Sequence, residues 1–283
     1  MSKNILIWLR NLSITLITVV ASIVFYAYQI EPNWFQVVPI SVTIPELPSS
    51  FEGFKIAQIS DLHADDSMNQ SKLAKIVKLV DAQQADIIAI TGDFFTSKPN
   101  LEALSLLGNN LFYLSPKVKT IAVLGNHDHI YNPRILSNLL QQDNILELSN
   151  SVYTIERGKD KLSLAGVDDY WKGKSRLDLV MEQLPEEGVA ILLAHEPDFA
   201  DISSKENRFA LQMSGHSHGG QVRIPFRSPP VLPPHGQKYP VGRYQVGNMV
   251  QYTNRGVGMV KPLVRFGSRP EITVFTLTKS LIG

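Results

Sequence analysis

The sequence predicts an α/β domain built on a largely parallel sheet and preceded by one membrane-spanning helix. Continuous apolar runs of strand length alternate with helical patterns, which is typical of a parallel sheet covered on both faces. An uncharged apolar run of about bilayer length lies near the N-terminus. The length of 283 residues suits one large domain with an anchor better than two independent domains.

The composition narrows the classes of function. Hydrophobic residues make up 44% of the chain and charged residues 19%, as in a globular protein with a sizeable core. The formal net charge of +1 argues against a nucleic-acid partner, which requires a strongly basic domain. The chain has no cysteine, which excludes disulfides, thiolate metal sites and cysteine nucleophiles. Any bound metal must therefore be held by His, Asp, Asn or Glu.

The N-terminal segment is predicted to anchor the chain in a membrane. Leu12 to Ile30 form an uncharged, mostly apolar run. Lys3 and Arg10 precede it and the next basic residue is Lys55, so the positive-inside rule places the N-terminus in the cytoplasm and the domain outside. A cleaved signal peptide is one alternative, although no small-x-small cleavage site is evident. A buried helix of the domain is another, but the run lacks amphipathic spacing.

These features divide the chain into three segments. Residues 1–30 form a cytoplasmic tip and a transmembrane anchor. Residues 31–50 form a Pro-rich linker, in which the alternating stretch from Val37 to Ile44 predicts an edge strand. Residues 51–283 form the globular domain, with helices predicted over Ser71–Gln83, Leu101–Phe112 and Pro133–Gln142.

Polar motifs follow five apolar strand runs directly. The runs are residues 55–59, 87–91, 121–124, 189–194 and 210–214. The residues that follow them are Asp61 and His63, then Asp93, then Asn126 to His129, then His195, and finally His216 and His218. Because the carboxyl ends of parallel strands open onto one crevice, we expect these side chains to converge on one site.

The residue types at these strand ends predict a metal centre. Carboxylates, imidazoles and an amide oxygen suit hard or borderline divalent ions such as Mn²⁺, Fe²⁺ and Zn²⁺. Asp61-x-His63 and His216-x-His218 each place two side chains on one side of an extended segment. Glycines precede Asp93, Asn126 and His216, where they allow a sharp turn and a close approach. Each motif alone is weak evidence, and only the five together are specific.

In this order the motifs resemble the signature of the calcineurin-like metallophosphoesterases, and the resemblance extends from about Glu31 to the C-terminus. Within that family the membrane-associated bacterial phosphodiesterases are most similar, as judged by residues 59–63, 215–223 and 269–273. The resemblance implies a four-layer αββα sandwich and two divalent metal ions. It implies that Asp61, His63, Asp93 and His218 hold one ion, and that Asp93, Asn126, His195 and His216 hold the other. It further implies that His127 contacts the phosphate or the leaving group and that Asp128 orients His127.

The resulting hypothesis is a two-metal hydrolase of phosphodiester, pyrophosphate or phosphomonoester bonds in a small molecule or a lipid. A hydroxide shared by the two metals would be the nucleophile, and His127 would protonate the leaving group. Phe94 to Lys98 depart from the Val-Asp-Arg-Gly-like stretch of the protein phosphatases, and Asp128 replaces their usual Glu. A protein-phosphatase role is therefore not expected, and no protein partner is identifiable.

Three alternatives to this hypothesis remain. One is cleavage of the pyrophosphate of UDP-2,3-diacylglucosamine, a cytoplasmic reaction against which the outward orientation counts. Another is a non-catalytic scaffold, although every ligand position is filled. A nuclease is disfavoured by the near-neutral charge.

Two features stay open on the sequence alone. His129 contacts either substrate or a neighbouring helix. The Pro-rich loop from Pro225 to Pro240, which contains His235, is either a solvated connection or a wall facing the substrate.

Overall fold

The computed structural model describes residues 3–114 and 116–279. Two six-stranded sheets form the centre of its domain. The first sheet has the strand order β1 (Gln36–Ile44), β12 (Glu271–Lys279), β2 (Lys55–Ile59), β3 (Ile87–Thr91), β4 (Lys119–Val123), β5 (Ile145–Glu147). The second has the order β10 (Gly242–Val246), β11 (Met249–Thr253), β9 (Phe209–Ser214), β8 (Val189–Leu193), β7 (Asp160–Gly166), β6 (Ser151–Arg157).

The strands that precede the five motifs are divided between these sheets. β2, β3 and β4 are parallel neighbours in the first sheet, and β8 and β9 are parallel neighbours in the second. The single sheet expected from the strand pattern is therefore wrong, because alternation of strands and helices does not say which strands pair. The two-sheet sandwich implied by the family resemblance is confirmed.

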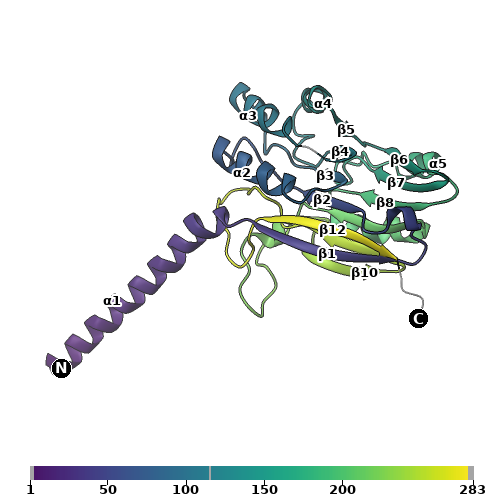
Figure 1. Ribbon diagram of the computed structural model, residues 1–283. Coiled ribbons are helices and arrows are strands. Elements are labelled where there is room, and N and C mark those ends of the chain that lie inside the picture. Colours follow the sequence, from purple (N-terminus) through teal and green to yellow (C-terminus); the bar gives the residue numbers. More distant parts are fainter. Residues whose placement is uncertain (1–2, 115, 280–283) are drawn as a thin grey trace.

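Helices cover the outer face of each sheet, which gives four layers (Figure 1). The first sheet is covered by α2 (Gln70–Asp81), α3 (Leu101–Leu111) and α4 (Pro133–Gln142). The second is covered by α5 (Leu177–Gln183) and α6 (Ala200–Ser203). Each of the first three helices begins after an asparagine whose side chain accepts a backbone N–H of the first turn: Asn69, Asn100 and Asn132.

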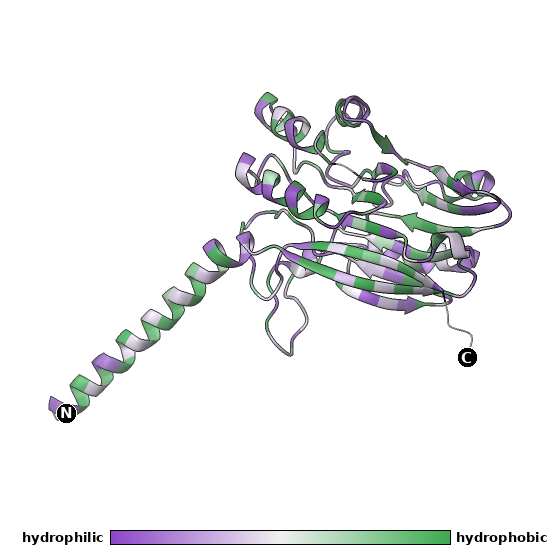
Figure 2. Cartoon of the chain, in the orientation of Figure 1, coloured by the Kyte–Doolittle hydropathy of each residue, from purple (hydrophilic) through white to green (hydrophobic). Residues whose placement is uncertain are grey.

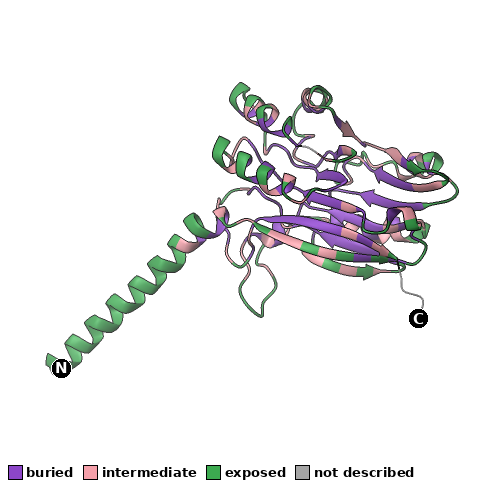
Figure 3. Cartoon of the chain, in the orientation of Figure 1, coloured by how far each residue is buried: buried purple, intermediate pink, exposed green. Residues whose placement is uncertain are grey.

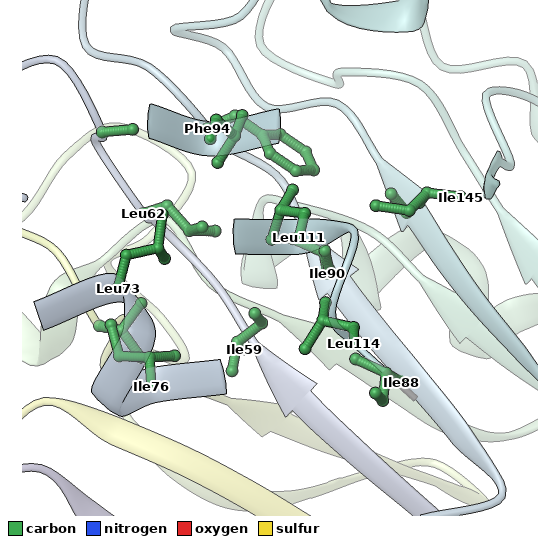
Figure 4. Packing of buried hydrophobic residues seen from close by; sticks show 14 of the residues in the cluster. Ile59, Leu62, Leu73, Ile76, Ile88, Ile90, Phe94, Leu111, Leu114 and Ile145 are labelled. Carbon is green, nitrogen blue, oxygen red and sulfur yellow. The ribbon is translucent and has the colours of Figure 1, made fainter. Parts of the chain in front are cut away.

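The strand β3 shows why the runs are apolar at every position. Ile87 and Ala89 face the second sheet, whereas Ile88 and Ile90 face the helices. Figure 4 shows Ile88 and Ile90 on the helix side, with Leu111 from α3. Full burial of each isoleucine contributes about 1.5–3 kcal/mol, so both faces stabilise the sandwich.

The helix α1 (Lys3–Phe25) extends away from the domain and buries none of its residues (Figures 1 and 3). Its surface is mostly apolar (Figure 2), and its hydroxyl groups are satisfied internally, as where Ser22 Oγ donates to the Thr18 carbonyl at 2.8 Å. The helix is long and apolar enough to cross a membrane. The alternative of a helix buried in the domain is excluded.

The chain between α1 and β1 is bonded to the domain. Glu31 is buried, and its carboxylate accepts the backbone N–H groups of Gly267 at 3.0 Å and Ser268 at 2.6 Å. The Ala27 carbonyl accepts the N–H of Arg265 at 3.0 Å. The hydroxyl of Ser268 in turn donates to the carbonyl of His218 at 2.9 Å. The end of the apolar helix is thus connected by hydrogen bonds to one of the predicted metal ligands.

Candidate metal centre

The predicted ligands lie just beyond the carboxyl ends of strands from both sheets. β2, β3 and β4 carry Asp61 and His63, then Asp93, then Asn126. β8 and β9 carry His195, then His216 and His218. All seven side chains are buried. The packing of the two sheets therefore places residues that are up to 157 positions apart in the chain at one edge of the sandwich.

One group consists of Asp61, His63 and His218, whose ligand atoms lie within 4.8 Å of one another. The Nε2 atoms of His63 and His218 are 3.2 Å apart, and His218 Nε2 is 3.4 Å from an Asp61 oxygen. The other nitrogen of His63, Nδ1, lies 3.0 Å from the Thr96 hydroxyl, which fixes the orientation of the ring.

A second group consists of Asp93, His195 and His216, again with ligand atoms within 4.8 Å of one another. His195 Nε2 lies 3.2 Å from Asp93 Oδ2. Its other nitrogen donates to the Thr91 carbonyl at 2.6 Å, and His216 Nε2 donates to the Pro234 carbonyl at 2.8 Å. Both rings are therefore held by the nitrogen that does not face the group.

Asp93 connects the two groups. Its Oδ2 atom is 3.2 Å from His195 Nε2 in one group and 3.8 Å from His63 Nε2 in the other. Burial alone would raise the pKa of Asp93, but the charge and the hydrogen bond of His195 lower it well below the usual range. An ionised carboxylate at this position can contact cations on both sides.

The donor atoms fit divalent cations. Buried atoms without a hydrogen-bond partner among the described residues include Asn126 Oδ1, His195 Nε2, His216 Nδ1 and His218 Nδ1. A buried polar atom left unpaired costs about 1–3 kcal/mol, and a bound cation would supply the missing partner for atoms that face it. Burial lowers the pKa of His63 to about 4 and that of His216 to about 3, so both imidazoles are neutral and have a lone pair for a metal.

The backbone at the site adopts conformations that non-glycine residues rarely use. Asp61, His63, Asp93, His216 and His218 all have φ between 46° and 70°, in the left-handed region. Such residues cost about 1–3 kcal/mol each and cluster where function requires a particular side-chain direction.

All three glycines that precede the ligands are required by close packing. A Cβ on Gly92 would overlap the His195 ring and the Gly125 backbone. A Cβ on Gly125 would overlap the Asp93 carboxylate, and one on Gly215 would overlap the side chains of Ser60 and Asp61. The close approach expected at these three positions is confirmed.

Asp128 does not orient His127, which corrects the role implied by the resemblance. Its carboxylate accepts the backbone N–H groups of Asp93, Phe94 and Gly125 at 2.9 Å each and that of Phe95 at 3.3 Å. His127 Nδ1 instead lies 2.6 Å from the Thr96 carbonyl. Asp128 therefore fixes the turn that carries Asp93, and a backbone carbonyl orients the histidine.

The site opens into a cavity of about 480 Å³ with a largely apolar wall. Asp93, Asn126, His127, His216 and His218 lie at its polar end. Apolar residues around it include Ile130, Trp171, Val222, Pro230, Val231, Pro233, Val260, Pro262 and Val264. Part of the Pro-rich loop thus forms a wall of this cavity and is not simply a solvated connection.

Several residues near the site carried no sequence signal or an ambiguous one. His129 Nε2 is 2.7 Å from the Asp168 carboxylate, so the histidine contacts an acidic loop and not a helix. The Trp171 ring packs edge-on against His216 with centroids 5.6 Å apart. The carboxylate of Glu196 accepts the N–H of Trp171 at 3.2 Å. In the sequence, only its position next to His195 connects Glu196 with the site.

Comparison with known proteins agrees with this arrangement. Residues 54–220 match the family model described as calcineurin-like phosphoesterase. The uncharacterized metallophosphoesterase YkuE of Bacillus subtilis is 32% identical over 89% of this chain and 88% of its own. The phosphodiesterase YaeI of Escherichia coli is 30% identical over 95% and 98%, respectively. A transmembrane protein with metallophosphoesterase domain from Danio rerio is 28% identical over 87% of this chain and 58% of its own.

Replacing Asp128 tests its role as a backbone anchor. In Asp128→Asn the amide nitrogen would face N–H donors, so the free energy of unfolding of the metal-free protein should fall by about 1–3 kcal/mol. Urea denaturation in the presence of a chelator measures this change. Asp178→Asn, which alters a surface carboxylate paired with Arg176, is the control and should change little. Unchanged stability of Asp128→Asn would contradict the anchoring role.

Proposed function

Since the chain belongs to the calcineurin-like phosphoesterase family and is a metal-dependent phosphoesterase, we propose that it hydrolyses phosphoesters with two divalent ions bound side by side. Asp61, His63 and His218 would hold one ion. Asn126, His195 and His216 would hold the other, and Asp93 would be shared. The observation that supports this proposal is the contact of Asp93 Oδ2 with a histidine of each group, at 3.2 and 3.8 Å.

The residues of the site would then bind, orient and protonate the substrate. Bound divalent ions supply Lewis acidity, which polarises the phosphoryl oxygens and activates water. His127 lines the cavity beside Asp93, and its ring packs edge-on against His63 with centroids 5.2 Å apart. With Nδ1 donating to the Thr96 carbonyl, Nε2 is the atom from which His127 would deliver a proton to the leaving oxygen.

The cavity supports a substrate with an apolar portion. Valine and proline side chains and the Trp171 ring line the same cavity as the metal-ligand side chains, so a phosphodiester or pyrophosphate of a small molecule or a lipid would match both kinds of lining. The name of the Escherichia coli relative favours a phosphodiester among these. UDP-2,3-diacylglucosamine is the alternative substrate if the domain faces the cytoplasm.

Metal content and turnover together test the two-ion assignment. Asp93→Ala should abolish detectable turnover and reduce bound metal at both positions, because the shared charge is lost. Asn126→Ala removes one neutral ligand and should weaken mainly one position. Elemental analysis and assays on phosphodiesters, monoesters and nucleotide sugars measure both effects. An Asp93→Ala protein with two tightly bound ions and normal rates would refute the sharing.

A second substitution separates proton delivery from metal binding. His127→Ala should keep its metal content and lose about 10²–10⁴-fold in rate, since general acid catalysis contributes that much. The loss should be smaller for nitrophenyl esters, whose leaving group hardly needs a proton. Equal losses for good and poor leaving groups would instead assign His127 to phosphate binding.

We further propose that α1 is a single uncleaved span with the domain outside the cytoplasmic membrane. Two basic residues, Lys3 and Arg10, precede the apolar run, and no basic residue follows it before Lys55. This difference supports the orientation. Protease added to intact spheroplasts should digest the domain and leave a cytoplasmic marker intact. Protection of the domain would reverse the orientation and favour the nucleotide–lipid pyrophosphate.

A further inference from the structure

Residues 223–234, which include the first part of the Pro-rich loop, begin beside the end of the apolar helix. The N–H of Arg223 donates to the Phe266 carbonyl at 2.7 Å. The Phe266 ring packs edge-on against Tyr26, just after α1, with centroids 6.2 Å apart. Tyr26, Arg223, Phe266 and Arg269 also line one shallow pocket. In Figure 1 a long loop projects from this end of the domain, on the side toward which α1 runs.

The loop exposes apolar side chains at its tip. Phe226 has no neighbour that shields it, with a relative exposure of 107%, and Val231 and Ile224 are 73% and 49% exposed. The N–H of Arg227 donates to the Ile224 carbonyl at 3.1 Å, which closes a turn around Phe226. A turn that holds a phenylalanine fully in solvent is unfavourable in water and favourable at a bilayer surface.

The charge around the loop matches an anionic membrane. Residues 223–234 contain Arg223 and Arg227 and no Asp or Glu, although the whole chain has a net charge of only +1. Arg223 and Arg227 flank the exposed Phe226. The Arg269 guanidinium lies 3.6 Å from the centre of the half-exposed Trp34 ring, close to the end of α1. Basic residues next to apolar and aromatic ones are typical of membrane-surface contacts.

We propose that loop 223–234 is a second membrane contact, in which Ile224 and Phe226 enter the bilayer surface and Arg223 and Arg227 bind anionic lipid headgroups. The inference rests on the proposed span of α1. A bilayer is favoured over a protein partner because the loop begins beside the end of the membrane helix and lacks acidic residues. With both contacts in place, the cavity wall formed by Pro230, Val231 and Pro233 would lie at the membrane surface.

The absence of cysteine makes a site-specific test direct. Full-length Phe226→Cys, labelled with a polarity-sensitive fluorophore, is placed in nanodiscs that contain phosphatidylglycerol and lipids with a nitroxide quencher. Lys159→Cys is the control, since Lys159 is also exposed and lies in the turn between β6 and β7, away from α1 (Figure 1). Ile17→Cys, within α1, reports the span itself. All three substitutions change exposed residues, so folding is preserved.

The proposal expects a blue-shifted, quenched signal for Phe226→Cys and an unshifted, unquenched one for Lys159→Cys. Adding Arg223→Glu and Arg227→Glu to Phe226→Cys should reduce its quenching. Equal signals from Phe226→Cys and Lys159→Cys, with Ile17→Cys quenched, would overturn the loop contact and leave the loop to a protein partner or the substrate. An unquenched Ile17→Cys would overturn the span as well. Neither result would affect hydrolysis of a soluble phosphodiester, which tests the catalytic proposal separately.

Discussion

The geometry of the centre depends on one buried carboxylate. Asp128 follows β4, yet its oxygens accept the N–H groups at the end of β3 as well as that of Gly125. Four N–H donors to this one carboxylate connect the ends of β3 and β4 beyond the last hydrogen bonds of the sheet. Because Asp93 lies in the turn so fixed, its position between His63 and His195 follows from the Asp128 carboxylate. A buried carboxylate with too few hydrogen-bond donors would destabilise the fold, and here both oxygens of Asp128 accept backbone N–H groups.

The individual elements were predictable from local pattern, but their assembly was not. The apolar runs predicted β2, β3, β8 and β9 to within a residue, and α4 matches its predicted bounds. The strands β6, β7, β10 and β11 were missed. β6 does not alternate between buried and exposed residues, β10 includes Gly242 and Arg243, and the buried strand β11 contains the polar residues Gln251 and Thr253. Nothing in a single sequence indicates that β2 pairs with the last strand, β12, which requires contacts across more than 200 residues.

The same limit applies to the site. The residue types and their order after the strands predicted which side chains gather. The partners of those side chains were beyond prediction, because most are backbone groups. Thr96, Thr91 and Pro234 contribute carbonyls that orient His127, His195 and His216. A carbonyl has no sequence signature, so the expectation that Asp128 orients its neighbour His127 was reasonable and wrong.

The position of β1 has a consequence for how the protein is made. β1 is an edge strand whose partner is β12, in parallel register from Gln36 beside Glu271 to Ile44 beside Lys279. β12 also pairs with β2, so β1 and β2 leave the ribosome long before their shared partner strand has been synthesised. Synthesis proceeds at about 5–20 residues per second, which leaves the first sheet open on that side for many seconds. During this interval the edge of β2 that pairs with β12 stays open, so the first sheet cannot be completed until β12 has been synthesised.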